Sequence, residues 1–208
     1  MPSQYVAVPE LAPPAINDDA LAALVQPTLD VEGCAALRPW RTDDAASVVE
    51  AFQDPSIQRW HVRRADSVSE AEQWIDRWHE AWIARSDCTW AIVDRRSDEL
   101  LGRIALKAID KQDGVADLAY WMVPAARGRG ICPNAMAAVS GWAFDCVGLT
   151  RLQLEHSTLN DASCRAAYKA GFIAEGIRRQ SARHADGWHD MHVHSRLRDD
   201  PQPLQPQL

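Results

Sequence analysis

The sequence has no apolar run near the ~20 residues that a membrane-spanning helix requires. No basic residue precedes an apolar stretch within its first ten residues. We therefore expect neither a membrane segment nor a signal peptide. The five cysteines are scattered singly, without a Cys-x-x-Cys pair. Such a set argues against a disulfide framework or a zinc site and is typical of a reducing cytoplasm, where we expect the protein to reside.

Positive charge is also in short supply. The chain has 22 Lys and Arg residues against 29 Asp and Glu residues, which gives a formal net charge of −7. Because nucleic-acid binding depends on Lys and Arg, this balance disfavours nucleic acid as a partner. A negative surface favours the approach of cationic ligands such as amines, although the same charge also serves simply to keep a protein in solution.

What the chain does contain fits one domain with a buried core, since it has 208 residues and a 47% apolar share. Residues 1–30 are rich in Pro and Ala and lack periodicity, so we expect an N-terminal arm. Residues 199–208 contain three prolines and three glutamines, and we expect a disordered tail there. The domain itself is expected over residues 31–198.

Hydrophobic periodicity within this domain predicts an α/β fold with a mixed sheet. Three strands, Thr89–Asp94, Leu100–Ile109 and Val115–Met122, are separated by short turns, which favours an antiparallel meander. Other helices and strands are expected before and after these three strands in the sequence. They are a strand at Cys34–Pro39, a helix capped by Thr42, a helix opened by a Ser67–Glu70 capping box, a helix at Ile131–Cys146, a strand at Thr150–His156, a helix at Ala162–Ala170, and a hairpin of Ile173–Arg183 and Trp188–Arg196.

A glycine-rich turn, Arg127-Gly128-Arg129-Gly130-Ile131-Cys132, opens the helix after the meander. Its glycines let the backbone approach a ligand closely, and a helix start presents free N–H groups to an anion such as a pyrophosphate. A dinucleotide fingerprint would need a glycine where Pro133 stands, and a nucleoside-triphosphate loop would need Gly-Lys-Ser/Thr. A solvent-exposed turn that binds nothing is the alternative.

A second motif follows about thirty residues later. Three motifs together resemble the GNAT N-acetyltransferase superfamily: an Arg-x-x-Gly-x-(Gly/Ala) pattern after a strand, Asn160-Asp161-Ala162-Ser163, and Gly171-Phe172. The chain departs from the first pattern at its last position, where Cys132 replaces the usual Gly or Ala. The resemblance covers roughly residues 27–197. Three further stretches resemble its RimJ/RimL-type branch: Leu37-Arg38-Pro39-Trp40, Ala119-Tyr120-Trp121 and Asp186-Gly187-Trp188.

The resemblance implies a largely antiparallel central sheet flanked by helices, in which two splayed strands hold the pantetheine arm of acetyl-CoA. A backbone N–H near Met122 would polarise the thioester carbonyl, and Asn160 would orient the pantetheine or brace the strands. Arg127 and Arg129 would flank the pyrophosphate. The implied cofactor-binding residues are Trp121, Met122, Val123, Arg127, Gly128, Arg129, Gly130, Ile131, Cys132, Asn160 and Ser163.

The implied reaction is direct attack of an amine on the thioester, with a base for the ammonium proton and an acid for the thiolate. Many superfamily members place the acid, a tyrosine, at the position matching Ala167. The tyrosine here is Tyr168, about 100° further around the helix. Ser163 is therefore our candidate acid, with a locally bonded serine as the alternative. Asp117 is the candidate base, with a solvated strand residue as the alternative.

The remaining side chains of interest are interpreted as packing, supporting, acceptor-site or surface residues. We interpret the thiol of Cys132 as a packing group, and we expect Glu175 to support its strand. Trp60 and His61 are candidates to line the acceptor site. A last group, His189, His192 and His194, has no third ligand type nearby, so we interpret these residues as exposed strand histidines and expect no metal.

The sequence therefore predicts an N-acyltransferase that moves an acetyl group from acetyl-CoA to a primary amine. The amine belongs to a protein N-terminus or to a small molecule. The alternatives are a succinyl or other acyl donor in the same fold, and a non-catalytic CoA-binding or regulatory module. Because dimers are common in the branch, a second copy of the chain is a possible partner.

Overall fold

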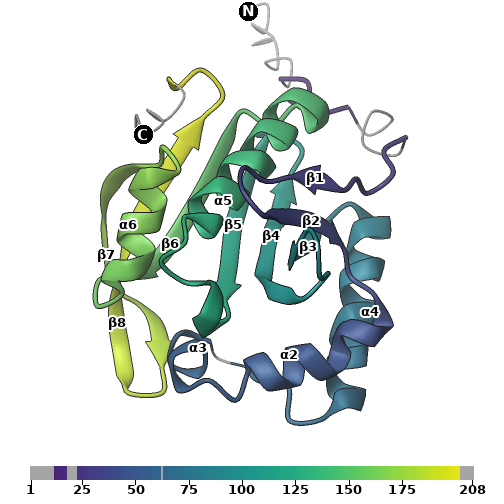
Figure 1. The fold of residues 1–208 in the computed structure, drawn as a ribbon. Coiled ribbons are helices and arrows are strands. Elements are labelled where there is room, and N and C mark those ends of the chain that lie inside the picture. Colours follow the sequence, from purple (N-terminus) through teal and green to yellow (C-terminus); the bar gives the residue numbers. More distant parts are fainter. Residues whose placement is uncertain (1–11, 18–22, 62, 202–208) are drawn as a thin grey trace, which may run out of the picture.

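The computed structural model describes residues 12–17, 23–61 and 63–201. The expected N-terminal arm and C-terminal tail therefore lie partly outside the described residues. Within these residues one eight-stranded sheet runs in the order β1-β2-β3-β4-β5-β6-β8-β7 (Figure 1). Its strands are β1 (Leu29–Asp30), β2 (Ala35–Pro39), β3 (Cys88–Asp94), β4 (Leu100–Asp110), β5 (Val115–Met122), β6 (Arg151–Ser157), β7 (Ile173–His184) and β8 (Gly187–Leu197).

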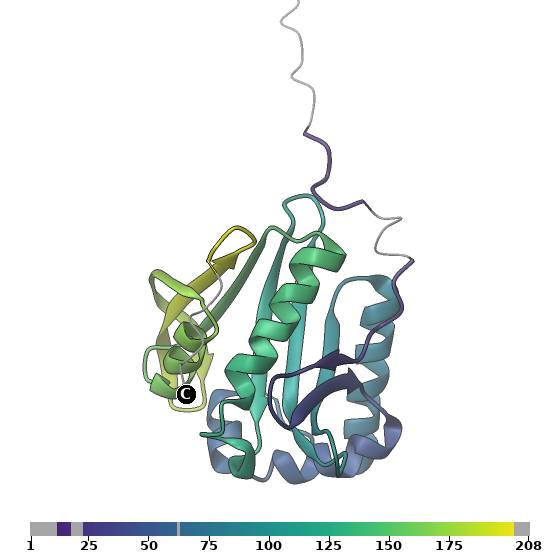
Figure 2. The ribbon, with the colours of Figure 1, turned by 45° about the horizontal axis from the view of Figure 1, so that its top comes forward.

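Helices flank the sheet on both faces. They are α2 (Ala45–Ala51), α3 (Pro55–Trp60), α4 (Val68–Ala84), α5 (Ile131–Trp142) and α6 (Asp161–Lys169). Five of the six residues after Cys88 in β3 are buried, because the strand is covered from both sides. Trp90 faces a core shared with α5, whereas Ala91 faces a second core shared with α2 and α4 (Figures 1 and 2). The predicted mixed α/β fold with a largely antiparallel sheet is confirmed.

The strand pair β5–β6 is the one parallel neighbour pair in the sheet order. Hydrogen-bonded pairing covers only Val115–Asp117 opposite Arg151–Gln153. Beyond these residues the two strands diverge toward α3 (Figure 1). The splayed strand pair expected from the resemblance is therefore present, and five residues of β5 extend past the last paired position.

A buried ion pair joins β2 to the first helical segment. The guanidinium of Arg38 donates to both carboxylate oxygens of Asp44 at 2.8 Å, and both side chains are buried. The backbone N–H of Arg41 also donates to Asp44, at 2.8 Å. The prediction that Thr42 caps this segment is wrong, because Thr42 is already the first residue of a 3-10 turn and Asp44 makes the capping contact.

Helix α4 begins as the sequence predicts, with one difference. The hydroxyl of Ser67 accepts the N–H of Glu70 at 3.2 Å, but the Glu70 carboxylate accepts the N–H of Asp66 rather than that of Ser67. Of the tryptophans on this helix, Trp74 and Trp78 pack against the second core, and Trp82 packs against the first.

Two helical features were not predicted. The helix α5 does not continue unchanged to Cys146, because its last turn, Ala143–Val147, is a π-helical turn that ends at Gly148 with φ of +91°. The short helix α3 lies in a stretch for which no helix or strand was predicted. It begins at Pro55, and the Asp54 carboxylate caps it by accepting the N–H of Ile57 at 3.0 Å.

The histidines of the last strand are not exposed as expected. His194 is fully buried and His189 is 6% exposed. The reason is that β8 lies inside the sheet, between β6 and β7, and α6 contacts both β6 and β7. Alternation does place His192 and His194 in one group, as predicted.

Candidate active site

A cavity of about 390 Å³ opens where β5 and β6 diverge. Its walls come from α3, the end of β5, the glycine-rich turn and one side of α6. Val123, Arg129 and Asp117 are outside its lining. The predicted site residues that do line it are Trp121, Met122, Arg127, Gly128, Gly130, Ile131, Cys132, Asn160 and Ser163.

The glycine-rich turn leaves open space in front of a helix start. Gly128 and Gly130 have φ of +74° and +77°, a conformation that side chains disfavour. No heavy atom lies within 4 Å of a Cβ built on either residue. Helix α5 follows directly, and the N–H of Asn134 bonds to the carbonyl of Gly130. Since Pro133 has no N–H, Ile131 and Cys132 supply the unpaired donors that an anion such as a pyrophosphate needs.

Arg127 has a different role from the one expected. Its Nε and Nη2 atoms donate to the carbonyl oxygen of Met122 at 3.0 and 2.9 Å. The same guanidinium donates to Ser56 at 2.6 Å and pairs with Asp54 at 3.0 Å. Arg127 therefore braces the end of β5 against α3 instead of standing free beside a phosphate. Arg129 is exposed, its guanidinium donates to Cys34 Sγ at 3.3 Å, and it is the arginine left to flank a phosphate.

We expect Arg127→Ala to lower the free energy of unfolding by about 1–3 kcal/mol, because it leaves the half-buried Met122 carbonyl without its donors. Denaturant unfolding would measure this change. Arg129→Ala is the matched control and should stay within about 0.5 kcal/mol of wild type, as is usual at an exposed position. Equal effects of the two substitutions would contradict the bracing role.

The end of β5 presents a backbone donor to the cavity. The N–H of Val123 bonds to the Leu101 carbonyl on the β4 side, at 2.9 Å. Because N–H and C=O groups alternate in direction along a strand, both groups of Met122 point to the open side. Arg127 occupies the carbonyl. The Met122 N–H is left directed at the cavity, which is the arrangement expected for polarising a thioester carbonyl.

Two hydroxyl groups in the cavity wall, one from β5 and one from α6, are hydrogen-bonded to each other. The Tyr120 hydroxyl lies 2.7 Å from Ser163 Oγ, and Ser163 is 9% exposed. The N–H of Ser163 donates to Asn160 Oδ1 at 3.1 Å, so Asn160 caps α6 and fixes the position of Ser163. Burial raises the pKa of Tyr120, which keeps its hydroxyl protonated at neutral pH. The Ser163 side chain thus bonds across to β5 rather than locally.

Tyr120 is the site residue that the sequence analysis missed. It was noted only as part of a motif resembling the RimJ/RimL-type branch. Its spacing of two residues from Met122 was the available signal, because residues two apart lie on the same face of a strand. By contrast, Tyr168 is 56% exposed and Ala167 is buried outside the cavity lining. Leaving Tyr168 without a role therefore agrees with its position.

Two carboxylates that the sequence singled out, Asp117 and Glu175, both make contacts within the sheet. The Asp117 carboxylate accepts a hydrogen bond from Gln153 at 2.8 Å in the paired part of β5 and β6, and it is exposed. Its role as base stays a prediction without support from this geometry. Glu175 binds Arg151 and Ser195, and the Arg151 guanidinium is the main reason that its pKa falls to about 2.

Two cavity residues come from the end of α3 and the residue after it, Trp60 and His61. Burial lowers the pKa of His61 to about 4, so the ring is neutral and carries a lone pair at neutral pH. The described residues that line the cavity include no carboxylate. On the other wall, burial raises the pKa of Cys132 to about 12, which keeps the thiol protonated and agrees with a packing role.

An open helix start, a strand pair that diverges and a directed backbone donor form the arrangement expected for binding a coenzyme A thioester. The chain belongs to the acetyltransferase (GNAT) domain family, whose model matches residues 35–173. This membership confirms the predicted superfamily and the predicted acetyl-CoA-dependent acetyltransferase activity. No helix within the described residues is long and apolar enough to cross a membrane.

Known relatives agree with this family. The N-acetyltransferase YoaA of Bacillus subtilis is 26% identical over 145 residues, which cover 69% of this chain and 82% of YoaA. The ribosomal-protein-serine acetyltransferase of Escherichia coli is 28% identical over 104 residues, 50% of this chain and 58% of that protein. The structure of RimL, a ribosomal alpha-N-protein acetyltransferase in complex with coenzyme A, has a TM-score of 0.78 at 17% identity, covering 84% of this chain and 100% of RimL. At the level of the fold, the resemblance to the RimJ/RimL-type branch is confirmed.

Proposed function

We propose that the protein acetylates a primary amine, either at a protein N-terminus or on a small molecule, by direct attack of the amine on the thioester of acetyl-CoA. The observation that carries the proposal is a single cavity that joins the helix start at Gly130 to the Tyr120–Ser163 pair and to α3. Two relatives bear names that place their action on ribosomal proteins, which supports a protein N-terminus as one acceptor.

The donor end of the cavity supplies positioning and charge stabilisation. The N–H groups of Ile131 and Cys132, with the exposed Arg129, would hold the pyrophosphate at the start of α5. The Met122 N–H would stabilise the oxyanion that forms when the amine adds to the thioester carbon. The rest of the rate enhancement comes from holding the two reactants in the attacking geometry.

Two protons then have to move. The Tyr120–Ser163 pair is placed to give one to the departing thiolate, since both hydroxyls are held together at the cavity wall. At the acceptor end, His61 is the neutral imidazole of the cavity and would take the proton of the attacking amine, directly or through a water. A pKa near 4 makes His61 a weak base. The amine must therefore arrive largely unprotonated.

The proposal is tested by incubating the protein with acetyl-CoA and a panel of amines. The panel holds peptides with different N-terminal residues, including those of ribosomal proteins, and small mono- and polyamines. We expect free coenzyme A thiol to appear only with some amines, and the same amines to gain one acetyl group by mass spectrometry. A control reaction without amine measures how much of the free thiol comes from hydrolysis of the thioester. Measurable coenzyme A binding without amine-dependent thiol release would sink the proposal.

Two further predictions concern where the protein resides and whether it forms a dimer. A cytoplasmic location and a homodimer were expected from the sequence and from the resemblance, and both stay predictions. All five cysteines are free in the structure, which is compatible with a reducing compartment.

A further inference from the structure

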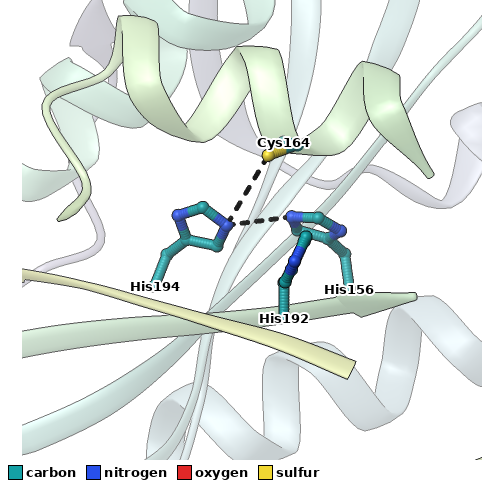
Figure 3. A group of neighbouring side chains, drawn as sticks. All are labelled: His156, Cys164, His192 and His194. Carbon is teal, nitrogen blue, oxygen red and sulfur yellow. Dashed lines mark hydrogen bonds between the residues drawn. The ribbon is translucent and has the colours of Figure 1, made fainter. Parts of the chain in front are cut away.

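Four potential metal ligands face one another between α6 and the sheet (Figure 3). They are His156 at the end of β6, Cys164 on α6, and His192 and His194 on β8. One ligand atom from each lies within 4.8 Å of all the others. None of the four lines the acetyl-transfer cavity. Cys164 follows Ser163, which does line it, but one residue along a helix turns the side chain by about 100°.

Two distances within the group are close to those of a tetrahedral zinc site. His156 Nε2 lies 3.1 Å from His194 Nε2, and Cys164 Sγ lies 4.0 Å from His194 Nε2. With metal bonds of about 2.0–2.1 Å to nitrogen and 2.3 Å to sulfur, tetrahedral geometry requires about 3.3 Å between two nitrogens and about 3.6 Å between nitrogen and sulfur. Shifts of a few tenths of an ångström would bring these atoms to coordination distances.

The protonation of His156 is already set for metal binding. Its Nδ1 lies 2.8 Å from the carbonyl oxygen of Ser157. Because a carbonyl only accepts, Nδ1 must carry the hydrogen, and the lone pair of the neutral ring sits on Nε2, which faces the other ligands. A backbone carbonyl that fixes the tautomer of a histidine in this way is a common support for metal ligands.

Hydrogen bonding among the described residues does not account for the burial of these rings. His194 is fully buried and His156 is 6% exposed. The Nδ1 atoms of His192 and His194 are buried without a hydrogen-bond partner. Burying unpaired polar groups is costly, and the acetyl-transfer site does not use these four residues. A bound cation would coordinate the facing Nε2 atoms of His156 and His194, in place of the hydrogen bond that they now share, and would hold the four side chains together.

We propose that His156, Cys164, His192 and His194 bind one zinc ion in a closed tetrahedral site. A set of three histidines and one cysteine leaves no open position, so the ion would be structural rather than catalytic. It would tie the first turn of α6 to β6 and β8. The sequence analysis expected no metal because it considered only neighbouring histidines, whereas His156 and Cys164 join the group through the fold.

Zinc binding is tested on protein prepared without a histidine tag. We expect about one zinc ion per chain by elemental analysis after loading and desalting. Cobalt(II), used as a spectroscopic substitute, should give tetrahedral visible bands and a sulfur-to-cobalt charge-transfer band. The near-isosteric Cys164→Ser should lose the charge-transfer band and weaken zinc binding at least about tenfold, since losing even an outer-shell partner usually costs that much.

Cys146→Ser is the matched control, because Cys146 is exposed and outside the group. It should bind zinc like the wild type. Circular dichroism checks that each variant folds. His192→Gln removes a second ligand and should weaken zinc binding to a similar extent. The proposal is overturned if wild-type protein binds no stoichiometric zinc, or if Cys164→Ser keeps the sulfur-to-cobalt band. Gly130→Glu protein should still bind zinc, which separates this test from that of acetyl transfer.

Discussion

A Gly130→Glu variant will bind coenzyme A at least about 100-fold more weakly than the wild type. Gly130 caps the start of α5, and the space in front of it is open, so a glutamate side chain would project where the pyrophosphate is expected. Placing like charges together costs several kcal/mol, and about 2.7 kcal/mol already corresponds to 100-fold. Isothermal titration calorimetry with coenzyme A measures the change directly.

Two controls separate charge from shape and strain. Gly130→Gln adds the same bulk and the same backbone strain without the charge, so it should bind more tightly than Gly130→Glu. Gly187→Glu places the same charge on another open, positive-φ glycine, in the β7–β8 turn, and should bind like the wild type. Unchanged affinity in Gly130→Glu would show that the pyrophosphate does not lie on this turn.

Tyr120→Phe should lower kcat by about 100-fold, at the lower end of what general acid–base catalysis contributes, with little change in the KM for acetyl-CoA. The substitution removes one hydroxyl of the pair and leaves the ring in place. Ser163→Ala should have a similar effect. Because the two hydroxyls act through one hydrogen bond, the double variant should be hardly slower than either single variant. Steady-state kinetics on any acceptor found in the amine panel provides the measurement.

Tyr168→Phe is the control for this prediction, since Tyr168 is largely exposed and lies outside the cavity lining. It should keep wild-type kcat. Wild-type kcat in Tyr120→Phe would exclude the hydroxyl pair as the source of the thiolate proton. Additive losses in the double variant would instead assign the two hydroxyls separate roles.

Local patterns in the sequence were enough to predict most of the sheet. The bounds of β5 agree to the residue, and Gly148 and Gly171 lie in the left-handed region just past helical segments, where a glycine is favoured. The glycine-rich turn before α5 was also predicted, because two glycines before a helix form a contiguous signal. The helix α3 was missed since it has only six residues and starts at a proline.

Local patterns could not predict the Tyr120–Ser163 pair or the proposed metal-ligand group, for a different reason. Tyr120 and Ser163 are 43 residues apart, and His156 and His194 are 38 apart. Each pair is created by packing between elements that lie far apart in the sequence. Local patterns do not show which such elements pack together. Arg127 shows the same limit, since its side chain looked like a phosphate ligand until the fold placed Asp54 and the Met122 carbonyl beside it.

The side chain of Arg127 links the two ends of the cavity through its contacts with both. One side chain holds both the strand end that would meet the donor and the helix α3 that walls the acceptor side. Any ligand that shifts the balance of these contacts changes the affinity of the other ligand. Since such linkage is reciprocal, an acceptor that tightens donor binding through this bridge is itself bound more tightly, by the same factor, once the donor is in place.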